Sequence, residues 1–326
     1  MSDGSDGGVP EFIHHPVMVD RVVELFSKVP SGLFVDATTG GAGHSSAILA
    51  SRPDLRLLGI DRDVDALDAA RRRLEPFGHR VQLHHARFDQ LSSILQQLGA
   101  QEVVGVMFDL GVSSPQLDRG DRGFSYRQHG PLDMRMDRDQ ERTAHDVING
   151  YSAEELADVL DRYGDERFSR RIAEAVVSHR PIETTTEFAE IVRDAIPAPA
   201  RRTGGHPAKR SFQAIRIEVN QELEILADAI DQAIDVLIPG GRAVVLSYHS
   251  GEDRIVKDRF RRAESGGCVC PSNLDCVCGA IPKIKFIKRG SEKASAAEIE
   301  SNPRAKSVRL RVVESVAFRP REHGAA

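Results

Sequence analysis

Two kinds of segment are missing from this 326-residue sequence. No run of apolar residues approaches the roughly eighteen that a membrane-spanning helix needs, and the first residues lack the apolar centre of a secretory signal peptide. Cysteine is also scarce, with four residues that all lie between positions 268 and 278. We therefore expect a cytoplasmic protein that neither enters a membrane nor depends on disulfides.

The composition is that of a soluble protein with room for two domains, at 40% hydrophobic and 29% charged residues. Residues 1–11, rich in Gly, Ser and Asp, are expected to form a disordered leader. A net charge of −5 argues against nonspecific coating of nucleic acid. Basic residues nevertheless gather at 201–216 and after Gly251, where 16 Lys and Arg accompany 10 Asp and Glu. This pattern indicates a surface for a polyanion, although solvated faces without a partner would give the same pattern.

A glycine-rich turn lies between an expected strand, residues 33–35, and an expected helix, residues 45–49. The dinucleotide pattern G-x-G-x-x-G fails here because Ser46 occupies its third glycine position. No G-K-[ST] follows, which excludes the phosphate loop of nucleotide triphosphatases. Glycines in such a turn let the backbone approach a ligand, and the free amides at the helix start face an anion.

Acidic residues on two strands indicate the kind of ligand. Asp36 ends the first strand, and Asp61 ends a second one at 55–60, where a carboxylate can accept hydrogen bonds from ribose hydroxyls. A ligand with a ribose and a small carboxylate but no pyrophosphate fits this arrangement, and S-adenosylmethionine is such a molecule. The alternative is an ordinary tight turn at Gly40 to Gly43, with Asp61 as a solvated loop residue.

Strands alternate with helices over the first third of the chain, which predicts an α/β fold with a parallel sheet. Further strands are expected at 81–84 and 103–108, and helices at 64–74 and 88–98. The strand signal then disappears, with helices expected at 153–163, 167–179 and 186–195. It resumes with a long helix at 218–237, a turn at 239–241, a strand at 242–246, a helix at 252–262 and paired strands at 284–288 and 307–313. We therefore expect a sheet domain of residues 12–117 and 214–326 that is interrupted by a helical domain of residues 118–213.

The loop after the fourth strand, residues 109–116, carries a candidate acid–base group. Asp109 could accept a proton from an incoming amine, and Gly111 would let a flat base approach the backbone. The structural alternative is an aspartate that caps a turn, which the following Ser-Ser-Pro sequence also supports.

Eight short blocks resemble, in order along the chain, the bacterial ribosomal RNA small-subunit methyltransferase H family. They are HPVM (15–18), the loop ending in GH (43–44), DLGVSSPQ (109–116), RGFS (122–125), GPLDMRMD (130–137), YGDE (163–166), FQAIR (212–216) and SYHS (247–250). The resemblance runs from about residue 14 to residue 313 and covers nearly the whole chain.

This resemblance implies a Rossmann-like class I S-adenosylmethionine-dependent methyltransferase sheet with an inserted all-helical domain. It also implies methylation of the exocyclic N4 amine of a cytidine in the decoding region of 16S ribosomal RNA, within the small ribosomal subunit. The cofactor contacts of the family fall on Ala42, Gly43, His44, Asp61, Phe88, Asp109 and Gln116. Position 42 is commonly glycine in this motif, so a positive backbone angle there would be unfavourable for this chain.

The residues themselves favour an amine over a ring carbon as the methyl acceptor. Methylation of carbon 5 of cytosine needs a cysteine nucleophile, and the loop at 109–116 contains none. An exocyclic amine needs positioning and an acceptor for its proton. Asp109 and His249 are the candidates for that acceptor, although a histidine at this position would serve equally well as a structural hydrogen-bond donor.

Two further groups have competing interpretations. Phe124 and Tyr126 alternate with Arg119, Arg122 and Arg127, as in a surface that stacks bases, but nearby aspartates favour internal ion pairs for some of these arginines. The block at 205–216 has no acid close by in the sequence, so we expect it to contact RNA.

All four cysteines, Cys268, Cys270, Cys276 and Cys278, fall within eleven residues. Such a group in a cytosolic chain predicts a structural zinc site, although C-x-C spacing is less typical than C-x2-C. Two other functions remain open for the whole chain. One is a cofactor-sensing RNA-binding protein without turnover, and the other is a nicotinamide-dependent oxidoreductase, which the missing third glycine disfavours.

Overall fold

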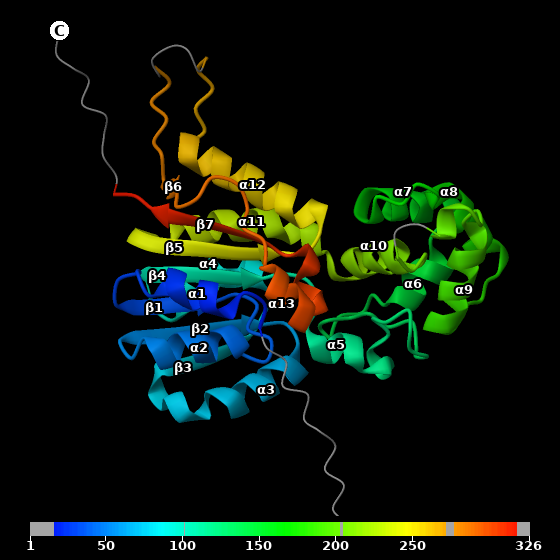
Figure 1. The fold of residues 1–326 in the computed structure, drawn as a ribbon, viewed down its shortest axis with the longest axis horizontal. Helices are drawn as coiled ribbons and strands as arrows, with labels where there is room; N and C mark the ends of the chain where they lie inside the picture. The colour runs from blue at the N-terminus through cyan, green and yellow to red at the C-terminus, as the bar shows by residue number, and fades with distance from the viewer. Residues whose placement is uncertain (1–15, 101, 203–204, 272–276, 318–326) are drawn as a thin grey trace, which may run out of the picture.

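The computed structural model describes residues 16–100, 102–202, 205–271 and 277–317, so the predicted leader lies outside the described residues. Its centre is a seven-stranded sheet in the order β3-β2-β1-β4-β5-β7-β6 (Figure 1). The strands β1 (Gly32–Asp36), β2 (Leu55–Asp61), β3 (Val81–His85), β4 (Val103–Asp109) and β5 (Leu237–Ser247) are parallel. The strand β7 (Arg309–Ser315) is antiparallel to both β5 and the edge strand β6 (Ile284–Phe286). The predicted α/β fold with a parallel sheet and a final strand pair is confirmed.

Helices cover both faces of the sheet because alternate strand residues are apolar on each side. Phe34 packs with α1 (Val19–Phe26), α2 (Gly43–Ser51) and α3 (Val64–Leu74), whereas its neighbour Val35 packs with α4 (Leu91–Gln97), α11 (Glu222–Asp235) and α12 (Ser250–Ser265). This two-sided burial is typical of doubly wound sheets. No helix among the described residues is long and apolar enough to cross a membrane.

The order of the strands positions a crevice. The strand β1 lies between β2 and β4, so the chain leaves β1 in one direction and later returns on its other side. Ligands of doubly wound sheets bind at such a switch point, outside the carboxyl ends of the strands. Asp36, Asp61 and Asp109 are the last residues of β1, β2 and β4, as the sequence predicts.

Between β4 and β5, the described residues form a helical lobe whose β pairing is limited to one isolated bridge. It contains α5 (Ser114–Asp118), α6 (Ala144–Gly150), α7 (Ala153–Gly164), α8 (Ser169–Ser178), α9 (Thr185–Ala195) and α10 (Lys209–Asn220). Capping boxes at Thr143, Ser152 and Thr184 begin three of these helices. The lobe buries a hydrophobic cluster of its own, which extends along α10 to Val219. The predicted boundary after residue 213 therefore falls inside a helix.

The helix predicted over residues 218–237 is present as α11, but it begins at Glu222, because residues 218–220 belong to α10. The chain breaks between α10 and α11 at Gln221, whose φ is +53°. Asn220 is held there by distant backbone: its Nδ2 donates to the carbonyl of Met134 at 2.8 Å, and its Oδ1 accepts from the amide of Met136 at 2.9 Å. The turn predicted at residues 239–241 lies inside β5, where the pairing with β4 shifts register and Gly240 has a φ of +83°.

Candidate active site

The glycine-rich turn after β1 is shaped by close contacts. Gly40 has a φ of +51°, and its amide donates to Oδ2 of Asp61 at 2.7 Å. A Cβ on Gly43 would lie 2.4 Å from Cγ of Pro16, closer than side chains approach one another. The turn therefore needs glycine at these two positions for different reasons, backbone angle at the first and space at the second.

Ala42 adopts the unfavourable backbone angle that the sequence raises as a difficulty. Its φ is +57°, in the left-handed region, which costs a residue with a Cβ about 1–2 kcal/mol. The Cβ is fully buried in the cluster that joins α1, α2 and the sheet, and burial of one methyl recovers about 0.8 kcal/mol. Packing thus offsets much of the cost of alanine where the motif commonly has glycine.

Asp36 lies at the bottom of the crevice, almost fully buried. Its Oδ2 accepts a hydrogen bond from the Ser45 hydroxyl at 2.5 Å, and its Oδ1 accepts a longer one from the Thr38 amide at 3.3 Å. Burial outweighs these two hydrogen bonds and raises the pKa of Asp36 to about 6. A carboxyl with this pKa changes its charge close to neutral pH.

Asp109 lies beside Asp36 in the site, at the end of β4, with 28% of its side chain exposed. The Tyr248 hydroxyl donates to its Oδ1 at 2.7 Å, and Nδ1 of His44 lies 3.5 Å from its Oδ2. Loss of solvation raises the pKa of Asp109, while His44 and the Tyr248 hydroxyl act in the opposite direction. His44 is oriented by the carbonyl of Val17, 2.8 Å from its Nε2. Asp109 is thus a fixed carboxylate that still has an open side.

Asp61 ends β2, as the sequence predicts, and Phe88 lies in the turn that follows β3. The Asp61 carboxylate accepts from the amides of Gly40 and Asp63, the second at 2.9 Å, and burial raises its pKa. Phe88 follows β3 and packs edge-on against Phe108 of β4, with ring centroids 5.9 Å apart. Both side chains lie along the edge of the sheet where the crevice opens.

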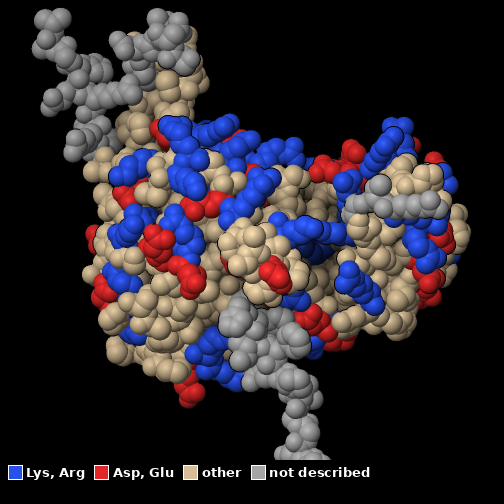
Figure 2. All heavy atoms as spheres, viewed as in Figure 1, with Lys and Arg blue, Asp and Glu red and all other residues tan. Residues whose placement is uncertain are grey.

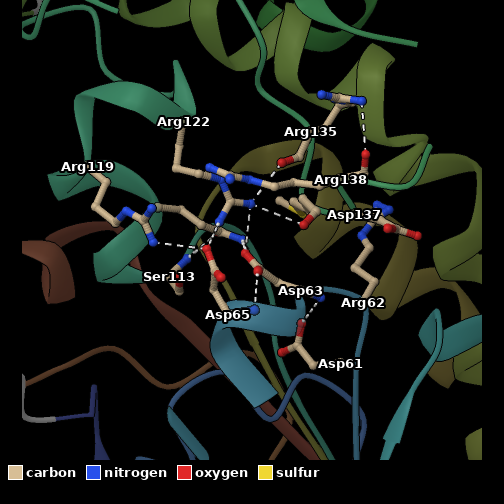
Figure 3. Close-up of polar contacts among 12 residues, drawn as sticks. Asp61, Arg62, Asp63, Asp65, Ser113, Arg119, Arg122, Arg135, Asp137 and Arg138 are labelled. Atoms are coloured by element: carbon tan, nitrogen blue, oxygen red, sulfur yellow. Dashed lines mark hydrogen bonds and ion pairs between the residues drawn. The ribbon is translucent and has the colours of Figure 1, made fainter. Parts of the chain in front are cut away.

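Gln116 belongs to a polar network that closes the β2 side of the crevice. Figure 3 shows Arg122 and Asp63 of this network. Its Nε2 donates to Oδ2 of Asp63 at 2.7 Å, and Arg122 donates to the same oxygen at 2.9 Å. Arg122 is buried and also donates to the carbonyls of Arg135 and Met136. We call Asp63, Asp65, Gln116, Arg119 and Arg122 the Arg122 network. The interpretation of Arg119 and Arg122 as internal ion pairs is confirmed, since Arg119 pairs with Asp65 and Asp121.

His249 begins α12 and turns toward its own helix. Its Nε2 lies 3.1 Å from Oε1 of Glu252, at an angle that does not make a hydrogen bond. The other Glu252 oxygen accepts from the backbone amides of Tyr248 and His249 at 2.7 and 3.2 Å. Burial raises the pKa of Glu252, but the His249 ring and the backbone amide of Tyr248 outweigh it, so the pKa is lowered. The His249 ring is thus held by its own helix, whereas Asp109 keeps an exposed side.

The expectation that the block at 205–216 has no neutralising acid is wrong. Arg216 pairs with Glu222 through both carboxylate oxygens, at 2.8 and 3.0 Å, and Arg210 donates to the carbonyl of Asp165. His206 stacks on Tyr126, with ring centroids 4.4 Å apart. Arg201, from the same basic stretch, pairs with Asp194. Much of this stretch therefore contributes to the fold.

Three of the four cysteines lie together. Sulfur atoms of Cys268, Cys270 and Cys278 are within 4.8 Å of one another, on the segment that follows α12. Cys276 lies outside the described residues. Figure 1 shows that α12 carries this segment away from the carboxyl ends of the strands, so these cysteines are remote from Asp109.

Comparison with known proteins agrees with this geometry. A family model described as the MraW methylase family matches residues 11–316. The chain belongs to the MraW methylase family. It is 51% identical over 313 residues to Ribosomal RNA small subunit methyltransferase H of Parafrankia sp. strain EAN1pec, covering 94% of this chain and 95% of that protein. It is 50% identical to the protein of the same name from Thermobifida fusca, covering 94% of each.

Membership of the MraW methylase family makes the chain a methyltransferase. Among solved structures, an rRNA methylase from Streptococcus thermophilus aligns with 91% of this chain and 95% of its own at a TM-score of 0.41 and 11% identity. That similarity is too low to support a conclusion, and the α/β methyltransferase fold rests on the strand order and the family.

Tyr248 is the residue in the site that the sequence did not assign. It lies in the block SYHS, next to His249, and histidine is the more familiar acid–base residue. The sequence could have indicated Tyr248 through its position directly after β5, because side chains at the carboxyl ends of parallel strands reach the same crevice as Asp109.

Proposed function

We propose that this methyltransferase transfers a methyl group from S-adenosylmethionine to the exocyclic N4 amine of a cytidine in the decoding region of 16S ribosomal RNA. The observation that supports this most is the Asp109 carboxylate, fixed by Tyr248 and His44 beside the glycine-rich turn yet open on one side. The names of the relatives, which specify the RNA of the small ribosomal subunit, support the substrate class.

The residues of the crevice fit S-adenosylmethionine, which when bound supplies an electrophilic methyl group. The first amides of α2, at Gly43, His44 and Ser45, have no partner within the helix and suit the carboxylate of the methionine part. Asp61 is placed to accept from ribose hydroxyls. Side chains or backbone of the other predicted contacts border the same crevice: Ala42, Phe88, Asp109 and Gln116.

Asp109 takes the proton that the amine loses as its nitrogen gains the methyl group. Its charge is held in place by the Tyr248 hydroxyl, so the carboxylate need not reorganise during the reaction. His249 is the second candidate, although its ring faces Glu252. The target base must be unstacked to reach this position.

A ring-carbon mechanism is disfavoured by the position of the thiols. Methylation of carbon 5 needs a cysteine beside the base, and the described cysteines lie on the far segment after α12. The helical lobe, which we propose as a domain that begins near residue 118 and extends through α10, would present the RNA. The reaction would take place on small ribosomal subunits in the cytoplasm.

Product identification tests this function. Small ribosomal subunits that lack the modification are incubated with the protein and labelled S-adenosylmethionine, then digested, and the labelled nucleoside is identified. We expect N4-methylcytidine. Label on carbon 5 would contradict the proposed chemistry, and binding of both ligands without any label would favour a cofactor-sensing RNA-binding protein.

We also propose a structural zinc ion at Cys268, Cys270 and Cys278. Zinc–sulfur bonds of about 2.3 Å in a tetrahedron place sulfur atoms about 3.8 Å apart. The sulfur atoms of Cys268 and Cys278 are 3.7 Å apart. We expect about one zinc per chain by elemental analysis of the purified protein and a loss of that zinc in the Cys268→Ser variant, with methyl transfer retained. If the purified protein contains no zinc, and adding zinc does not change its free energy of unfolding, the proposed site is contradicted.

A further inference from the structure

A groove opens beside the proposed base site, on the β5 and β7 side of the crevice. Its volume is about 590 Å³, within the range of small-ligand pockets. Tyr248 lines it, and the hydroxyl of the same residue is bonded to Asp109 at 2.7 Å. The groove is therefore separated from Asp109 by no more than the Tyr248 side chain.

Four cations line this groove without a carboxylate partner among the described residues. They come from three separate segments: Arg254 from α12, Lys293 from the segment following β6, and Lys306 and Arg309 from the turn before β7 and the first residue of β7. Within the part of the chain that the structure describes, none of the four lies within 4.0 Å of an acidic oxygen. Arg309 has only a long hydrogen bond to the Ser291 hydroxyl there, at 3.4 Å.

Two acids, Asp253 and Asp165, also line the groove. Asp253 receives two hydrogen bonds from Arg311, at 2.7 and 3.1 Å, and Asp165 accepts from the Ser250 hydroxyl at 3.0 Å. Neither carboxylate forms an ion pair with the four cations, which outnumber these two acids in the groove. Figure 2 shows basic side chains gathered over α12 and in the hollow between the sheet and the helical lobe.

A second cavity shows that such neutralisation is available in this protein. It lies between α11 and the far end of α12, and it is lined by Arg259 and Lys283. There two of the three lining cations are paired, Arg259 with Asp231 and Lys283 with Asp235, while Arg262 has no acidic partner among the described residues. The groove beside Tyr248 thus gathers four cations without an ion pair among the described residues, against one in this cavity, and such a surplus of cations is expected where a polyanion binds.

We propose that this groove binds the phosphodiester backbone of single-stranded RNA next to the nucleotide whose base enters the site. We call it the phosphate groove, defined by Arg254, Lys293, Lys306 and Arg309 beside Tyr248. The inference rests on the proposed function, because it makes the backbone of the same RNA its ligand. Contacts to phosphate position a nucleic acid without reading its sequence, which leaves recognition of the cytidine to the crevice.

The test compares two triple variants with equal loss of charge. The groove variant is Arg254→Gln, Lys293→Gln and Lys306→Gln. The control is Arg56→Gln, Arg72→Gln and Arg261→Gln, all exposed, without an acidic partner among the described residues, and toward the amino ends of the strands. Binding of a fluorescent single-stranded RNA that contains cytidine is measured by anisotropy at several salt concentrations.

We expect the groove variant to bind this RNA about 10- to 100-fold more weakly at low salt, with the slope of log affinity against log salt reduced by about 2. The control should lose no more than about twofold in affinity and keep most of the wild-type slope. Binding of S-adenosylmethionine, measured by calorimetry, should be the same in all three proteins. Equal RNA affinity and slope in the groove variant and its control would overturn the phosphate groove.

Methyl transfer separates this inference from the proposed function. If the wild type methylates cytidine N4 but the groove variant behaves as the control, the phosphate groove is wrong and the function stands. If the wild type never transfers a methyl group but its RNA affinity still depends on the groove, the function is wrong and the groove stands. Competition by polyglutamate as effective as that by RNA would also overturn the inference, because it would show a surface for acidic peptide.

Discussion

Arg122 and Arg254 lie on opposite sides of the same crevice, and the protein uses them differently. Arg122, on the β2 side, is buried and donates to Asp63 and to two backbone carbonyls. Arg254, on the β5 and β7 side, is exposed and has no acidic partner among the described residues. Charge alone therefore does not mark a binding surface, since Arg122 stabilises the fold whereas Arg254 is available to a ligand.

The carboxylates follow the same division. Asp63 is surrounded by donors from Gln116, Arg122 and the Asp65 amide, which leave it no free side. Asp109 has a tyrosine and a histidine on two sides and remains partly exposed. We expect substitutions on the closed side to lower stability and those on the open side to lower activity.

The largest effect should come from Asp109→Asn on the open side. Loss of the proton acceptor is expected to lower kcat by about 10²- to 10⁴-fold, with folding retained. In the wild type, activity should appear as pH rises through the pKa of Asp109, and burial places that limb above the ordinary range of aspartate. Single-turnover rates as a function of pH measure both effects.

Tyr248→Phe is the matched control for this pH dependence. The Tyr248 hydroxyl stabilises ionised Asp109, so its removal should shift the acidic limb to higher pH. Full turnover in Asp109→Asn, or a limb that stays at the position of ordinary aspartate, would remove this carboxylate from the mechanism.

On the closed side, Arg122→Gln should lower the free energy of unfolding by about 3–5 kcal/mol, because it leaves Asp63 buried without its charged partner. Urea unfolding followed by circular dichroism measures the change. Adding Asp63→Asn should recover part of the loss, since the unpaired charge is then gone. A loss below about 1 kcal/mol in the single variant would show that the Arg122 network is not structural.

Asp36, buried at the bottom of the crevice, is expected to make the stability of the protein depend on pH. Its pKa is about 6 in the folded protein and near 3.8 when unfolded, so the folded state binds its proton more tightly. Its contribution to stability is present below pH 4 and is lost as pH rises to 6, by about 3 kcal/mol. Unfolding free energies of wild type and Asp36→Asn at several pH values check this. The same pH dependence in both proteins would contradict the assignment.

The smallest effect on stability should come from Arg254→Gln alone. Because this exposed arginine has no acidic partner in the described part of the chain, the free energy of unfolding should change by less than about 0.5 kcal/mol. The salt slope of RNA binding should nevertheless fall by about 0.7, the value for one phosphate contact with a single strand. Destabilisation comparable to that of Arg122→Gln would abolish the distinction between the two arginines.

The sequence predicts the features that depend on neighbours along the chain. Apolar runs that end in Asp36, Asp61 and Asp109 define three strand ends, and strand order then brings these residues to one crevice. The helix α1 was detectable in the same way, because Val22, Leu25 and Phe26 follow helical spacing, but the sequence interpretation did not include it.

Features that depend on distant partners could not be predicted. The break at Gln221 is fixed by contacts from Asn220 to residues more than eighty positions earlier. The pair of Arg216 and Glu222 is different, because the acid lies only six positions later and the sequence interpretation overlooked it. The phosphate groove requires α12 and the two segments before β7 to meet, which no local pattern in the sequence specifies.

Calorimetric titration of S-adenosylmethionine tests the central claim most directly, that the crevice at the ends of β1, β2 and β4 holds the methyl donor. The account predicts one site per chain in the wild type and about 10- to 100-fold weaker binding in Asp61→Asn, which loses a charged acceptor for ribose hydroxyls. No binding to the folded wild type, or equal affinity in the variant, would contradict it.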